Sequence, residues 1–414
     1  MNVLERSAIF SLITRASHHP LNVNYFRNLC AGIALSALGD QFYNVALSWS
    51  VLQMTGSSAT LGSMLMLAAV PRTLMMLFGG LLCDRISPRR ILICATSARM
   101  ILVGLLAAIT SISSIHLEIL YALTIAFGFA DAFTAPAMGT LVPTLVTADQ
   151  LYGANSVTQA ITPLCAALGP IAAGVMVKRF GSSAVFAFDS ASFIFLIMSL
   201  YMVPEKPRPV MQSSSGIWVS IGDGIRCVIR DPSLRYVTLF ATAVNLCLSG
   251  PVAVGLATLA KVRFDSPTAL GALFSAFGAG TLIGMILAGA IGRQLRRRGW
   301  TLLILSAVVG LGFMALPFLM SLVATVLALA VMGVAGGFMD VQVVSWVQLR
   351  VANEFLGRVM SVLILTLVGL APISIGVTGF AVQMHMSLTF LSAGICMTLS
   401  AVAFAMSKHF RSIE

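Results

Sequence analysis

The stretch FGGLLCDRISPRRIL at residues 78–92 joins two long apolar runs through a short charged turn. Its Ser-Pro pair favours a tight turn, because proline presets the backbone angle φ that such turns require. We therefore expect one helix to end near Asp84 and Arg85 and the next to begin near Arg89 and Arg90. The stretch predicts a helical hairpin that turns at a membrane surface.

The amino-acid composition indicates whether the chain is soluble or embedded in a membrane. Of the 414 residues, 58% are hydrophobic and 9% are charged, and the mean hydropathy is +0.97. A soluble protein cannot hide this much apolar surface, so an all-α integral membrane protein is expected. The net charge of +11 lies in short segments between apolar runs, which points to membrane orientation and away from nucleic-acid binding.

Apolar stretches long enough to cross a bilayer, which takes about 20 residues, recur along the whole chain. Six lie in each half, so twelve transmembrane helices are expected. They cover residues 26–53, 59–82, 90–113, 117–142, 154–177 and 183–203, and then 236–260, 267–292, 300–320, 322–347, 357–382 and 386–407.

Lysine and arginine are distributed unevenly among the connecting segments. With the N-terminus inside, the predicted cytoplasmic segments hold 19 of the 25 basic residues and the outer loops hold four. Cytoplasmic loops of membrane proteins carry such an excess. A multi-pass protein of the cell membrane is expected, with a cytoplasmic arm at 1–25 and a cytoplasmic tail at 408–414.

The sequence indicates two related halves. LGPIAAG at 168–174 is echoed by LAPISIG at 370–376, and the order of spans agrees with that match. Internal repeats of this kind indicate duplication. We expect two pseudo-symmetric six-helix bundles, at 26–203 and 236–407, joined by a cytoplasmic linker at 204–235.

Polar groups inside the spans indicate where the chemistry lies, since a charge at the bilayer centre costs at least ~2.5–3.5 kcal/mol. Asp40 lies in the middle of the first span, with Asn44 one turn later on the same face. Asp131 lies in the fourth span, and Asn245 lies on a polar face of the seventh span that has no acid. Two interpretations of Asp40 stay open: proton coupling or substrate contact, and a structural hydrogen-bonding role.

Arg72 in the second span and Arg99 in the third are the basic residues that fall inside predicted spans and away from the span ends. A guanidinium keeps its charge, so its burial must be matched by a carboxylate, carbonyl groups or water. Asp131 and Asp84 are the candidate partners. A buried charge network is therefore expected in the first half.

The turn at 78–92 resembles a motif of the major facilitator superfamily, which reads glycine, three residues, Asp-Arg, one residue, glycine, Arg-Arg. Gly80, Asp84, Arg85, Arg89 and Arg90 match it, whereas a serine and a proline stand where the family usually has glycine and arginine. The resemblance implies the twelve-helix transporter fold and a role for this loop as a conformational gate.

A gate needs a partner in the other half. Asp84 is expected to face the N-terminal end of the eleventh span, near Gly357 and Arg358. Free backbone N–H groups and the helix dipole attract an anion at such a position.

Another motif lies in the fifth span. Gly169 and Pro170, followed by Gly174, resemble the fifth-helix motif of the antiporter branches of the family. Proline removes a backbone hydrogen bond and softens a helix, so a bend is expected here, either fixed or used during transport.

Three further segments resemble the branch that contains macrolide efflux proteins and the enterobactin exporter. They are LGDQFYNVALSW at 38–49, DQLYGANSV at 149–157 and EFLGRVMSV at 354–362. The similarity implies a proton-driven exporter, an antiporter of drug-like compounds or metabolites, in a bacterial inner membrane.

Other function classes lack their motifs. No Walker A loop, GxSxG or HExxH occurs, and the five histidines lie at loops or helix ends. A transporter without cofactor or metal is expected, neither an enzyme nor a channel. Its expected partners are a small-molecule substrate, protons and the bilayer, without nucleic acid, and the chain is expected to be monomeric. An uptake or lipid transporter, and a non-transporting scaffold or sensor, are the alternatives.

Overall fold

The structure is a computed structural model that describes residues 20–112, 116–204, 217–295, 297–407 and 410. Every regular element in these ranges is a helix. Eight stretches of the described chain are long and apolar enough to cross a membrane. The expectation of an all-helical membrane protein is therefore confirmed.

The first part of the chain begins with a short turn that leads into a long helix. Helix α2 ends at Gly56, whose positive φ of 62° suits glycine at a helix C-terminus. The next loop is short, and α4 begins at Pro88 after Ser87. The elements are η1 (Pro20–Asn22), α2 (Asn24–Thr55), α3 (Ser58–Arg85), α4 (Pro88–Thr110), α5 (Leu117–Asp131), α6 (Thr134–Leu145) and α7 (Leu151–Met202).

The second part uses proline repeatedly at helix starts, where the missing N–H costs nothing. Pro232 and Pro267 begin two of its helices. The elements are α8 (Ile217–Arg230), α9 (Pro232–Gly250), η2 (Pro251–Gly255), α10 (Leu256–Leu259), η3 (Ala260–Phe264), α11 (Pro267–Ile291), η4 (Gly292–Gln294), α12 (Arg298–Ala315), η5 (Leu316–Phe318), α13 (Leu322–Arg350), α14 (Asn353–Gly369) and α15 (Ala371–Met406).

Two long helical stretches contain a backbone break. Helix α7 has 52 residues and is interrupted at Gly181, with φ of 80°, and α15 is interrupted at His385, with φ of −152°. Both breaks fall between stretches that the sequence predicts as separate spans. Each stretch is thus two helices joined by a sharp bend.

Two of the predicted spans are not continuous helices. The stretch predicted at 117–142 divides into α5 and α6, and the stretch predicted at 357–382 divides into α14 and α15. In both, a proline follows the division, Pro136 in α6 and Pro372 in α15. Proline has no N–H to donate and clashes with the carbonyl four residues before it, so the helix restarts there.

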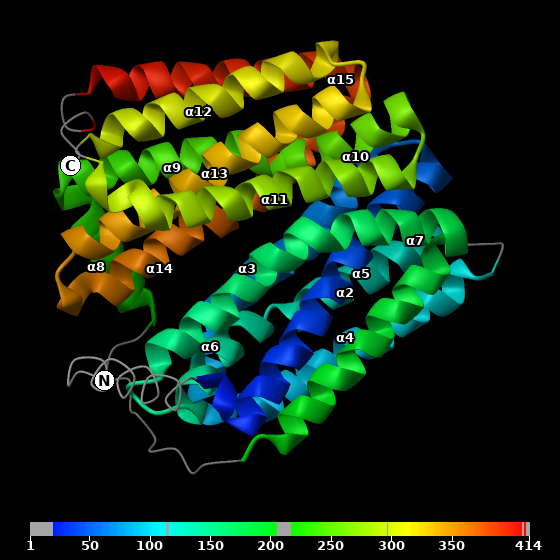
Figure 1. Cartoon of the computed structure of the whole chain (residues 1–414), viewed down its shortest axis with the longest axis horizontal. Helices are drawn as coiled ribbons and strands as arrows, with labels where there is room; N and C mark the ends of the chain where they lie inside the picture. The colour runs from blue at the N-terminus through cyan, green and yellow to red at the C-terminus, as the bar shows by residue number, and fades with distance from the viewer. Residues whose placement is uncertain (1–19, 113–115, 205–216, 296, 408–409, 411–414) are drawn as a thin grey trace, which may run out of the picture.

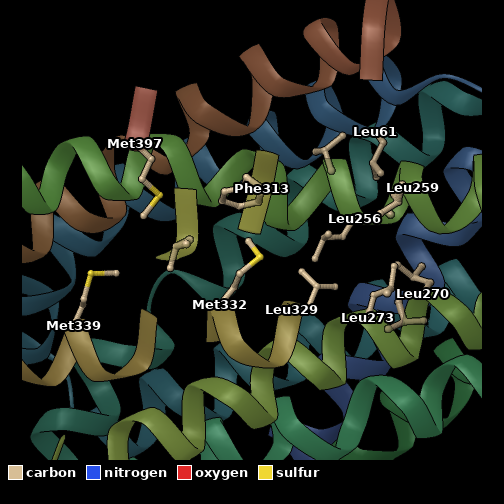
Figure 2. Packing of buried hydrophobic residues seen from close by; sticks show 14 of the residues in the cluster. Leu61, Leu256, Leu259, Leu270, Leu273, Phe313, Leu329, Met332, Met339 and Met397 are labelled. Atoms are coloured by element: carbon tan, nitrogen blue, oxygen red, sulfur yellow. The ribbon is translucent and has the colours of Figure 1, made fainter. Parts of the chain in front are cut away.

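Figure 1 shows α2 to α7 gathered on one side and α8 to α15 on the other. Within the first group α7 packs against α2 and α4, and within the second α11 packs against α13 and α12 against α15. A continuous cluster of buried hydrophobic side chains runs through both groups. Figure 2 shows part of it, with side chains from α3, α10, α11, α12, α13 and α15.

The two groups touch most closely along two helix pairs that use small residues. A Cβ at Gly278 of α11 would lie 2.3 Å from the carbonyl oxygen of Ala166 in α7. A Cβ at Gly62 of α3 would lie 2.6 Å from the Cα of Gly379 in α15. Glycine lets helix backbones approach this closely. In Figure 1 the ribbons of the two groups approach near α7 and α10, and they lie farther apart near α6 and α14.

Candidate functional site

A chain of alternating charges crosses four helices of the first group. Arg72 of α3 places its Nε 3.1 Å from Asp131 Oδ2, and Arg99 of α4 places its Nη1 3.3 Å from Asp131 Oδ1. Arg99 also donates from Nη2 to Oδ1 of Asp40 in α2. The order Arg72, Asp131, Arg99, Asp40 gives each of these charges at least one opposite neighbour. We call these four residues the charge network.

Arg99 is the buried centre of this network, with only 2% of its side chain exposed. Its guanidinium lies 5.1 Å from the ring centroid of Phe127 in α5 and 4.6 Å from that of Phe193 in α7. Aromatic faces attract a cation, and more strongly when water is excluded. The two rings therefore hold the guanidinium between α5 and α7 while its nitrogens face the carboxylates.

Local structure sets the two acids in different surroundings. Asp131 is the last residue of α5, directly before the division at Ala132 and Phe133, and 14% of its side chain is exposed. Asp40 lies in the middle of α2, and its side chain is 34% exposed. Of the two acids that contact Arg99, Asp40 is thus the more accessible.

A cavity of about 380 Å³ lies beside the network, between the two groups of helices. The polar lining comes from the first group, which contributes Gln41, Tyr43, Asn44, Ser48, Arg72, Thr124 and Asp131 together with apolar residues such as Leu47, Leu65 and Phe127. The second group contributes Val252, Ala253, Phe274, Phe277, Gly278 and Ile375. Such a mixed pocket suits an organic molecule with an apolar body and a few polar groups.

Of the four residues predicted for substrate or proton binding, some lie at the cavity and one does not. Asn44 and Asp131 line the cavity, and Asp40 joins it indirectly through Arg99. Asn245 does not belong to the lining, and its Oδ1 instead accepts a hydrogen bond of 2.8 Å from Ser249 Oγ. The structure brings three of the four residues to one place.

Two acids, Asp131 and Asp84, were predicted as partners of Arg72 and Arg99. Asp131 contacts both arginines. The side chain of Asp84 lies outside the described residues. The pairing of Arg99 with Asp40 was missed by the sequence reasoning, although both lie in the middle of predicted spans. Equal depth in neighbouring spans was the available signal, but it does not say which helix faces point toward each other.

The predicted gate is described only in part. Gly80, Asp84 and Arg85 lie in a stretch whose side chains are outside the described residues. Arg89 donates from Nε to the carbonyl of Leu200 at 2.8 Å, tying α4 to the end of α7.

The remaining gate residues lie at the starts of α4 and α14. Arg90 is exposed on the same turn as Arg89. A Cβ at Gly357 of α14 would meet no atom of the described chain within 4 Å. Arg358 donates from Nη1 to Asp223 Oδ2 in α8 at 3.1 Å. This contact joins α8, a helix within the predicted linker, to the start of α14.

The predicted bend motif of the fifth span lies at the contact with α11. A Cβ at Gly174 would lie 2.4 Å from the carbonyl oxygen of Pro267, and a Cβ at Gly271 would lie 2.2 Å from that of Pro170. Gly169 packs against Gln41 of α2. The non-helical residue that the structure gives within α7 is Gly181, between the fifth and sixth predicted spans. The bend at Pro170 stays a prediction.

Asp189, an acid in the sixth predicted span, lies deep in the structure. Asp189 of α7 is fully buried, and a Cβ at the neighbouring Gly39 would lie 2.2 Å from its Oδ1. Asp189 is therefore beside Asp40 in α2. Its position within the second half of α7, eight residues after Gly181, was the signal for this depth.

Comparison with known proteins shows the family to which the chain belongs. The family model of the Major Facilitator Superfamily matches residues 29–376, and the chain belongs to that superfamily. It is a membrane transporter, not an enzyme, as the sequence predicts.

Several relatives are similar over most of their length. The multidrug efflux pump Tap of Mycolicibacterium fortuitum is 24% identical, with 97% of this chain and 99% of Tap covered. Macrolide efflux protein A of Streptococcus pyogenes is 21% identical, covering 94% and 97%. The enterobactin exporter EntS of Salmonella typhi is 21% identical, covering 85% and 83%. The resemblance to the macrolide-efflux and enterobactin-exporter branch is thus confirmed.

Solved structures show the same fold. The crystal structure of the nucleoside transporter NupG gives a TM-score of 0.73 at 15% identity, covering 92% of this chain and 98% of that one. At this identity the likeness concerns the fold.

Proposed function

We propose that this chain is a proton-coupled exporter that moves drug-like compounds or small metabolites by alternating access. The observation that carries the proposal is the charge network beside the cavity between the two groups of helices. Carboxylates that share a buried arginine respond to protonation, because each proton removes one partner of an ion pair. The export direction is supported by the efflux relatives Tap, macrolide efflux protein A and EntS.

The proposed architecture is twelve membrane crossings in two six-helix bundles, at 26–203 and 236–407, with a linker at 204–235. The eight candidate spans include two stretches of 52 residues, each interrupted by a bend and long enough for two crossings of about 20 residues. Helices α2 and α3, of 32 and 28 residues, supply two more. The protein is proposed to act as a monomer, since the cavity is lined within one chain.

The proposed orientation has both termini in the cytoplasm of a bacterial cell, with the protein in the inner membrane. On this assignment the contacts of Gly62 with Gly379 and of Gly278 with Ala166 lie in the outer half of the membrane. The outer end also contains Ser58, whose N–H donates to Gln383 Oε1 at 2.7 Å. The conformation is therefore assigned as closed outside and open toward the cytoplasm.

Asp40 is proposed as a residue that binds and releases the coupling proton. In this conformation it pairs with Arg99 and is 34% exposed. When the cavity opens to the other side, the surroundings of Asp40 change, and protonation would release its hold on Arg99. Asp131, held by both arginines, is proposed to keep the network in place.

The test is transport by the purified protein in proteoliposomes, with a panel of apolar cationic and neutral compounds, with and without an imposed pH gradient. Uphill movement of a compound that requires the pH gradient supports the proposal. The direction of that movement relative to the gradient distinguishes export from import. Accumulation driven in the import direction would favour the uptake alternative. Movement that ignores the gradient for every compound on the panel would remove proton coupling.

The gate at Asp84 is proposed as a second element. Asp84 is expected to approach the start of α14 when the cytoplasmic end closes, at a place where Arg358 now contacts Asp223. Asp84→Asn should therefore weaken the closed cytoplasmic end and slow transport while leaving membrane insertion intact. Cysteine cross-linking between the 78–92 turn and α14 measures this, and unchanged cross-linking with normal transport would contradict it.

A further inference from the structure

Asp189 lies in the wall between α7 and α2, and it is not explained by the four-residue network. None of its surface is exposed, and it packs against Gly39, the residue before Asp40. It lies within electrostatic range of both Asp40 and Arg99. A third carboxyl group therefore shares the surroundings of the buried Arg99 guanidinium.

The carboxyl of Asp189 has poor hydrogen-bond support. Ser192 Oγ lies 3.5 Å from Asp189 Oδ1, but it donates its proton to the backbone carbonyl of Asp189 at 2.7 Å. Asp189 Oδ2 accepts no hydrogen bond from any of the described residues. A buried ionised carboxylate without donors is strongly unfavourable, whereas the neutral acid is tolerated.

Arg99 has a matching free donor. Its Nη atoms contact Asp40 and Asp131, but its buried Nε donates to no acceptor within the described part of the chain. Arg99 and Asp189 therefore each have one buried polar atom without a partner, and the two side chains are close enough to interact electrostatically. Such atoms are rare in folded proteins and require an explanation.

The charges around Arg99 do not balance if every acid is ionised. Asp40, Asp131 and Asp189 contribute three negative charges, and Arg72 and Arg99 contribute two positive ones. One bound proton makes the five groups neutral. The geometry puts it on Asp189, because Asp40 and Asp131 both contact a guanidinium.

We propose that Asp189 is a second proton-binding residue of the transporter, protonated in this conformation and deprotonated when Arg99 turns toward it. In that step the O–H bond of Asp189 breaks, the proton forms a new O–H bond on the Asp40 carboxylate, and the hydrogen bonds of Arg99 shift from Asp40 to Asp189. Net charge is unchanged. The more exposed Asp40 then releases the proton, a role that rests on the proposed proton coupling.

Other titratable groups also face this place. Tyr43 of α2 stacks on Phe127, with 4.4 Å between ring centroids, and Cys165 of α7 lies within electrostatic range of Asp40. Both are neutral in their ordinary protonated forms near pH 7. Tyr43 and Cys165 therefore add no charge to the three acids and two arginines counted above.

Infrared spectroscopy of the purified protein in lipid nanodiscs tests where the proton is. The wild type should show the carbonyl stretch of a protonated acid near pH 7, shifted in D₂O, and Asp189→Asn should abolish it. Glu118→Gln, at an exposed acid at the start of α5, is the matched control and should leave the band unchanged. A band that survives in Asp189→Asn would overturn the proposal.

Two further variants separate Asp189 from Asp40 as the site of the proton. Ser192→Ala removes the hydroxyl oxygen that lies 3.5 Å from Asp189 Oδ1 and should move the band, because a carbonyl stretch responds to nearby polar groups. An unmoved band would place the proton on another acid and overturn the proposal. Asp189→Asn should keep the thermal stability of the wild type, because the amide resembles a neutral acid. Asp40→Asn should lower it, because it breaks an ion pair. A large loss of stability in Asp189→Asn would show that the acid is ionised and would contradict the proposal.

Transport measurements connect the site to function. Asp189→Asn should reduce gradient-driven accumulation at least tenfold and leave downhill exchange within a factor of about two of the wild type. Unchanged accumulation would overturn the coupling role of Asp189. If the wild type itself ignores the pH gradient, the proposed function fails, whereas the infrared band still reports whether Asp189 holds a proton.

Discussion

The two walls of the central cavity differ in chemistry although they belong to similar helical groups. The wall from α2, α3 and α5 contains Arg72 and Asp131 and connects through Arg99 to Asp40. The facing wall from η2, α11 and α15 is formed by apolar side chains such as Phe277 and Ile375. The charged side chains that line the cavity therefore lie on one side of it.

This difference suggests a division of labour. Charged groups in a buried network resist being moved apart, because each separation leaves an unpaired charge. Contacts between apolar and small residues can shift at a lower cost in free energy. The contact between α7 and α11 is of this kind, with Gly271 and Gly278 at close approaches of the two backbones. Under the proposed function, the charged wall would respond to protons, and the apolar wall would supply the moving surface and the substrate contacts.

The largest expected effect comes from removing the centre of the network. Arg99→Ala should destabilise the folded protein by about 3–5 kcal/mol, because it removes the buried guanidinium that Asp40 and Asp131 share. Denaturant unfolding of the detergent-solubilised protein measures this. Arg72→Ala is the comparison, and it should cost less than about 1 kcal/mol because the Arg72 side chain is 60% exposed.

A double-mutant cycle sharpens this result. Adding Asp40→Asn to Arg99→Ala should recover part of the lost stability, since it removes one of the unpaired charges. Equal losses for Arg99→Ala and Arg72→Ala, or strictly additive effects in the cycle, would show that the network is not the unit described.

A second variant tests coupling without removing the side chain. Asp40→Asn keeps size and hydrogen bonding but cannot titrate, so gradient-driven accumulation should be lost while downhill exchange remains. Transport by the folded variant, measured as a function of the imposed pH gradient, decides this. Uphill transport at the wild-type level would exclude Asp40 from coupling and direct attention to Asp131.

A third variant addresses the contact between the groups. Gly278→Leu should hinder closure of the α7–α11 contact and slow transport several-fold, because its Cβ would already lie 2.3 Å from the carbonyl oxygen of Ala166. Gly289→Leu, in the same helix at a position where a Cβ meets no atom of the described chain within 4 Å, is the matched control. Spin-label distances between the bend of α7 near Gly181 and the start of α11 near Pro267 should lengthen in the first variant only. Equal distances in the two variants would contradict the role of this contact.

The smallest expected effect lies in the apolar wall. Phe277→Ala should raise KM a few-fold for bulky substrates, because it removes apolar contact area in the cavity. Its dependence on the pH gradient should match that of the wild type. A changed gradient dependence would mean that the apolar wall takes part in coupling, and the division between the two walls would fail.

The sequence alone determined the features that depend on local composition. Hydropathy decided the membrane class, because each span must be apolar over its own length. The 78–92 turn ends α3 and begins α4 near the predicted positions, since proline and charge act locally. Even the depth of Asp40, Arg99 and Asp131 followed from counting residues along each span.

Only the tertiary structure decided which of these groups meet. The pairing of Arg99 with Asp40, and the burial of Asp189 against Gly39, depend on how α2, α4 and α7 are rotated about their axes. An apolar helix surrounded by lipid and protein shows little contrast between its faces, so its sequence leaves that rotation open. Close packing through glycines and the pairing of buried charges fix the rotation, and both depend on residues from distant parts of the chain.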